Sequence, residues 1–138
     1  MWTYEHTIET SAAPEAIWDL WADVGNWGAW NADVASIRIS GPFEAGAEIV
    51  MTPADQDPVH LRVAEATVNE LFVDEARFDG LLLRTAHRLD RGEGGRTRVT
   101  YRMEITGSGA DRLGPQIGPA ITADWPETMA ALVELAQD

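Results

Sequence analysis

The sequence predicts an α+β fold in which a curved, antiparallel, seven-stranded sheet wraps around a long C-terminal helix and leaves an internal cavity. Three observations support this prediction. Residues 2–10 alternate between apolar and polar side chains, six further strand-like segments follow between residues 33 and 107, and one apolar stripe of helical period follows residue 109. Short turns join the consecutive strands, so we expect sequence neighbours to pair antiparallel.

The N-terminal segment predicts a half-buried strand followed by a short helix. In residues 2–10, one face carries two aromatic side chains, a histidine and an isoleucine, and the other carries threonine and glutamate. Ser11 is a candidate N-cap, and Pro14 suits the first turn of a helix. Gly25 should end this helix, after which the segment "NWGAWN" forms at most one or two further turns.

Turn residues divide the middle of the chain into segments of strand length. Gly41-Pro42, Asp79-Gly80 and the glycines between residues 92 and 95 are typical turn sequences. The last segment alternates most clearly, whereas "LFVDEARF" carries apolar groups on both faces. The predicted strands lie at about residues 34–40, 46–52, 58–68, 71–78, 81–90 and 96–106.

The C-terminal segment predicts one amphipathic helix whose first half is kinked or interrupted by Pro115, Pro119 and Pro126. Its apolar stripe consists of Leu113, Ile117, Ile121, Trp125, Met129 and Leu132. This helix is the only element available to cover the concave face of the sheet. One helix cannot fill the space beneath a strongly curved sheet, so we expect a cavity between them.

Composition excludes several classes of function. The 138 residues suit one domain spanning 1–138, with a net charge of −13 and no lysine. Such a charge disfavours nucleic-acid and membrane-surface partners, and no apolar run is long enough for membrane insertion. The chain lacks cysteine, and its N-terminal residues do not resemble a secretory signal, so we expect a cytoplasmic protein. The absence of lysine also suggests a GC-rich bacterial genome.

Four segments carry a family resemblance: "TIETSAAPEAIWDLWADVGNWGAWN", "GPFEAGAEIVMTP", "HRLDRGEGGRTRVTYRMEITG" and "TMAALVELA". The chain resembles the START-like helix-grip (SRPBCC) superfamily, in particular its polyketide cyclase/dehydrase and lipid-transport branch. The matching features include W-x-x-W-N and His87, which Thr97-Arg98-Val99 follows ten residues later. The resemblance implies a helix-grip fold that binds a small hydrophobic molecule. The superfamily contains enzymes, ligand carriers and co-chaperone-like proteins.

The predicted cavity would combine apolar walls with a few polar groups that orient a ligand. Aromatic walls favour an aromatic or polyketide-like ligand. The candidate lining residues are Tyr4, His6, Trp27, Trp30, Met51, Leu83, Thr85, His87, Tyr101, Met103, Ile117, Ile121 and Trp125. His87 and His6 are candidate general acids or bases if the protein is an enzyme, because histidine titrates near neutrality.

Three readings of function stay open at this point. The leading one is binding of a small hydrophobic ligand; the alternatives are a cyclase/dehydratase of lyase type and a co-chaperone-like interaction module. The three histidines are far apart in the sequence and no phosphate-binding or dinucleotide-binding motif is present, so we expect no metal and no cofactor. The protein would act as a monomer or homodimer.

Overall fold

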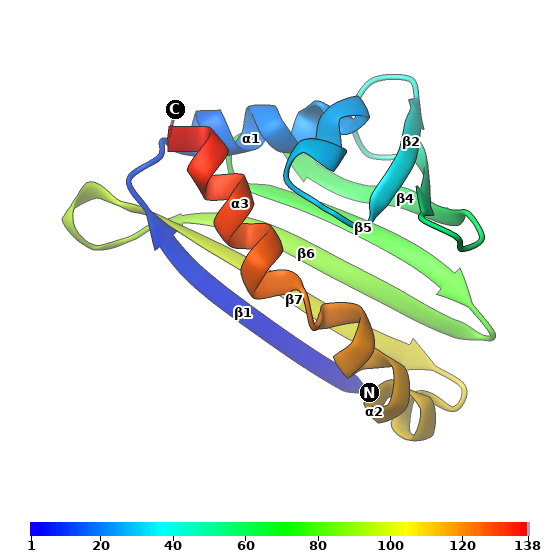
Figure 1. The fold of residues 1–138 in the computed structure, drawn as a ribbon. Helices are drawn as coiled ribbons and strands as arrows, with labels where there is room; N and C mark the ends of the chain where they lie inside the picture. Colours follow the sequence, from blue (N-terminus) through cyan, green and yellow to red (C-terminus); the bar gives the residue numbers. More distant parts are fainter. Residues whose placement is uncertain (138) are drawn as a thin grey trace.

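The computed structural model describes residues 1–137 and has seven strands, two α-helical segments at the C-terminus and one near the N-terminus (Figure 1). The strand bounds lie within two residues of the predicted ones. The elements are β1 (Trp2–Thr10), α1 (Pro14–Ala22), η1 (Val24–Ala29), β2 (Val34–Ser40), β3 (Glu48–Pro53), β4 (Val59–Thr67), β5 (Leu71–Phe78), β6 (Leu81–Arg91), η2 (Glu93–Gly95), β7 (Thr97–Gly107), α2 (Ala110–Thr122) and α3 (Trp125–Gln137).

The strands form one sheet in the order β1-β7-β6-β5-β4-β3-β2, and each neighbouring pair is antiparallel. Strands joined by short turns pair with each other, while β1 pairs with the last strand along its whole length. In Figure 1 the sheet curves, and α2 and α3 cross its concave face until α3 ends beside α1. The predicted fold class is confirmed.

The predicted C-terminal helix is present, but it is divided between residues 122 and 125 into α2 and α3. Pro115 and Pro119 lie inside α2 rather than at the break. Pro126 occupies the first turn of α3, where its missing N–H has no helical partner to lose.

The predicted apolar stripe is only partly buried in α2, where Leu113 and Ile117 are half-buried against the core. The buried positions of α2 are Ala110, Gly114, Gly118 and Thr122, while Ile121 is 40% exposed. The reason is close packing on β1: a Cβ atom added at Gly114 or Gly118 would lie 2.4–2.5 Å from side-chain atoms of Trp2. The small residues therefore face the sheet, and the larger apolar ones turn partly outward. In α3, Trp125, Met129 and Leu132 are buried as predicted.

Aromatic side chains form the centre of the core. Trp21 is fully buried, and its ring centroid lies 6.1 Å from that of Phe72 and 6.2 Å from that of Tyr101. Trp27 donates a hydrogen bond from Nε1 to the backbone oxygen of Trp21 at 2.9 Å, which holds η1 against α1. The tryptophan-rich turn therefore packs against α1 and the edge strand β2. None of the helices among residues 1–137 is long and apolar enough to cross a membrane.

Candidate ligand-binding cavity

A cavity of about 500 Å³ lies between the concave face of the sheet and the junction of α2 with α3. Side chains from η1, from the six consecutive strands β2 to β7 and from both C-terminal helical segments surround it. The lining residues are Trp27, Trp30, Asn31, Asp33, Val34, Met51, Pro53, Gln56, Leu61, Phe72, Asp74, Thr85, His87, Tyr101, Met103, Ala120, Ile121, Asp124, Trp125 and Thr128.

Most of the residues that the sequence suggested for the lining are brought together here. They are Trp27, Trp30, Met51, Thr85, His87, Tyr101, Met103, Ile121 and Trp125. The register explains part of this grouping, because Thr85 pairs with Met103 and His87 with Tyr101 between β6 and β7. Alternate residues of an antiparallel sheet point to the same face, so these side chains share the concave side.

Four suggested residues lie outside the lining: Tyr4, His6, Leu83 and Ile117. Tyr4 packs beside the cavity, with its ring centroid 5.5 Å from that of Trp125. His6 is half-buried on β1, opposite Tyr101 in the register. The cavity does not extend to this edge of the sheet, because α2 and α3 pack on β1 there.

His87 is buried and its protonation is defined by one contact. Its Nδ1 lies 3.0 Å from the backbone oxygen of Phe72, and a carbonyl can only accept, so Nδ1 carries the hydrogen. Burial lowers the pKa of His87 to about 4, although the bond to Phe72 opposes this shift. At neutral pH the ring is therefore neutral, and its Nε2 is a hydrogen-bond acceptor.

Tyr101, in contrast to His87, can donate a hydrogen bond into the cavity. Its Oη accepts a hydrogen bond of 3.1 Å from Nε1 of Trp21, so its own hydrogen is free for an acceptor in the cavity. Burial raises the pKa of Tyr101, the hydrogen bond from Trp21 opposes this, and the charge of Asp74 raises it further. The phenol therefore stays protonated and can donate.

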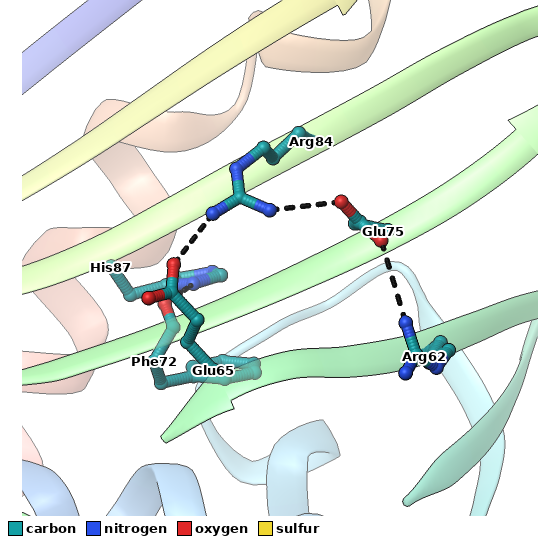
Figure 2. Close-up of polar contacts among 6 residues, drawn as sticks. All are labelled: Arg62, Glu65, Phe72, Glu75, Arg84 and His87. Carbon is teal, nitrogen blue, oxygen red and sulfur yellow. Dashed lines mark hydrogen bonds and ion pairs between the residues drawn. The ribbon is translucent and has the colours of Figure 1, made fainter. Parts of the chain in front are cut away.

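Asp74 is a buried carboxyl group that the sequence analysis missed. Burial, and then the charge of Glu75, raise its pKa to about 7, so it exchanges its proton near neutrality. The sequence does contain an indication of this buried group: Asp74 is the one carboxylate on the strand face that also carries Phe72, and the other residues of that face are apolar. Glu75 points to the opposite face, where Arg84 and Arg62 bind it at 2.8 and 3.8 Å (Figure 2).

A second acidic group lies where residues 31–34 meet the α2–α3 junction. Asp33 is exposed, Asp124 is half-buried, and their carboxyl groups are close enough for their charges to interact. Burial raises the pKa of Asp124 to about 6, and the neighbouring carboxyl group of Asp33 raises it further. These residues are 91 positions apart in the chain, so no local pattern could have paired them.

Among residues 1–137, no cluster of three His, Asp or Glu side chains could hold a metal ion.

The sheet order, the C-terminal helical segments and the cavity between them define a helix-grip fold. No family model and no curated protein matches the chain. Solved structures do match. A point mutant of norcoclaurine synthase from Thalictrum flavum, in complex with a transition-state analogue, is 13% identical, with 99% of this chain and 94% of that one covered and a TM-score of 0.75. Ara h 8.0201 is 12% identical, with 99% and 97% covered and a TM-score of 0.78. A protein from Thermobifida fusca is 21% identical, with 99% and 93% covered and a TM-score of 0.74.

Proposed function

We propose that this protein binds a small, hydrophobic, ring-containing molecule of aromatic or polyketide-like character in the cavity beneath α2 and α3. The observation that carries the proposal is the cavity of about 500 Å³ with Trp27, Trp30 and Trp125 in its wall. Planar side chains suit a planar ligand because offset stacking adds to the burial of apolar area. A volume of this size matches that of ordinary small-molecule sites.

Polar groups at fixed positions would orient such a ligand. Tyr101 can donate a hydrogen bond to a carbonyl or hydroxyl oxygen, and the neutral His87 can accept one from a ligand hydroxyl. Both side chains are held by protein hydrogen bonds before a ligand arrives, which reduces the entropy lost on binding.

Isothermal titration calorimetry with 1-naphthol and with 1-hydroxyanthraquinone tests the proposal. Ile121 lines the cavity and is 40% exposed, so Ile121→Trp should narrow the entrance while the protein stays folded. Leu135→Trp is the matched control, because Leu135 is also 40% exposed on a C-terminal helix but lies outside the lining. We expect saturable binding to the wild type and to Leu135→Trp, and at least tenfold weaker binding to Ile121→Trp. No saturable binding of either probe, or equal binding by both variants, would refute the proposal.

A second candidate function is a cyclase or dehydratase on a polyketide-like substrate. Asp74 favours it, since a carboxyl group with a pKa of about 7 in the cavity can take a proton from carbon and return it. The hydroxyl of Tyr101 would stabilise the enolate oxygen that forms. His87 would act as a hydrogen-bond acceptor, and His6 lies outside the cavity lining.

Heptane-2,6-dione provides an assay for this candidate, because its aldol cyclisation and loss of water give a conjugated enone with ultraviolet absorbance. Asp74→Asn and His87→Ala should lower turnover, whereas His6→Ala should not. Unchanged turnover in Asp74→Asn would remove the acid-base role. The third reading, an interaction module, has less support: the exposed large apolar residues of the described chain (Met1, Val68, Phe78, Ile121 and Leu135) are spread over different segments.

A further inference from the structure

The charges around the cavity all have the same sign. Three carboxyl groups line it, those of Asp33, Asp74 and Asp124, and no arginine is among the lining residues of the described chain. The remaining titratable groups, His87 and Tyr101, are neutral at neutral pH. An anionic ligand would meet uncompensated repulsion here, whereas a cation would find partners.

The pair formed by Asp33 and Asp124 is the position where a cation would gain most. Both carboxyl groups line the cavity, and two neighbouring carboxyl groups cannot both ionise without mutual repulsion, which a positive charge between them removes. The start of α3 accounts for a carboxylate at Asp124, because negative groups are favoured at helix N-termini. It does not account for the second carboxyl group, contributed by the segment before β2.

The adjoining wall supplies rings for the rest of the ligand. Trp125 follows Asp124 directly in the chain, and the rings of Trp27 and Trp30 lie 5.8 Å apart in the same lining. Indole faces attract cations as well as aromatic rings.

We propose that the cavity selects an aromatic amine: a hydrophobic ring system against Trp27, Trp30 and Trp125, with a protonated amino group between Asp33 and Asp124. This inference rests on the proposed binding function and names the class of ligand for the same site.

Three naphthalene probes that differ only in charge test this selectivity by calorimetry at pH 7.5 and 0.15 M salt. They are 2-(1-naphthyl)ethylamine, which is cationic, 2-(1-naphthyl)ethanol, which is neutral, and 1-naphthaleneacetate, which is anionic. We expect the amine to bind at least tenfold more tightly than the alcohol, and the acetate to bind most weakly. Equal or tighter binding of the alcohol would overturn the inference and leave the proposed binding function intact. Failure of all three probes, together with 1-naphthol, would overturn both.

Two double variants separate a local contact from the general charge of the protein. Asp33→Asn/Asp124→Asn should weaken amine binding at least tenfold and leave alcohol binding within twofold. Asp19→Asn/Asp90→Asn removes two exposed carboxylates elsewhere and should leave both affinities within twofold. If the first variant weakens both probes equally, or if the control variant weakens the amine as much, the amine site between Asp33 and Asp124 is refuted.

Discussion

Replacing Asp74 with asparagine is expected to change how the stability of the protein depends on pH. The folded state raises the pKa of Asp74 from its ordinary value of 3.8 to about 7. Between these values the folded protein holds a proton that the unfolded chain has released, so the free energy of unfolding falls as pH rises. The slope is about 1.4 kcal/mol for each pH unit, and it disappears above about pH 7. From pH 5.5 to pH 8.5 the contribution of Asp74 should therefore fall by about 2 kcal/mol.

Urea unfolding followed by tryptophan fluorescence measures this change. Asparagine does not titrate in this range. The free energy of unfolding of Asp74→Asn, relative to that of the wild type, should therefore increase by about 2 kcal/mol from pH 5.5 to pH 8.5. Subtracting the two curves removes the opposite contribution of His87, which both proteins share. Asp19→Asn makes the same change of charge at an exposed position, and its difference from the wild type should stay nearly constant. A constant difference for Asp74→Asn as well would show that Asp74 titrates normally, and the argument from burial would be wrong.

Three further predictions follow from packing and hydrogen bonding. Gly118→Ala should lower the free energy of unfolding in urea by about 1–3 kcal/mol, because the added Cβ would overlap the ring of Trp2. Gly25→Ala is the control, because a Cβ at that position has no atom within 4 Å and should not show this cost. Equal effects of the two substitutions would contradict the packing of α2 on Trp2. Tyr101→Phe should cost about 1–3 kcal/mol in the same assay because Nε1 of Trp21 loses its acceptor, and an unchanged midpoint would count against that bond. Nitrogen-15 NMR should show His87 as a neutral, Nδ1-protonated ring from pH 8 to pH 5, with stability lost as pH falls from 6.5 towards 4; a ring pKa near 6.5 would contradict the burial argument.

Strands, turns and part of the cavity wall were predictable because they depend on side-chain alternation. Once β6 and β7 are placed as neighbours, Thr85, His87, Tyr101 and Met103 must share one face. The same parity placed Tyr4 and His6 on the concave face, but parity does not specify where along the sheet a helix will pack. The structure covers that edge with α2 and α3, and the cavity lies further towards β4 and β5.

The sequence by itself determined the order of elements, the concave face of the sheet and the need for a covering helix, because periodicity is a local property that reports which side of an element is buried. Only the tertiary structure decided where the C-terminal helix breaks, which of its faces meets Trp2, and which carboxyl groups share the cavity. Asp33 and Asp124 lie close together, and Asp74 holds its proton near neutrality, because of burial and long-range packing. These effects depend on residues far apart in the chain, and so no local pattern can specify them.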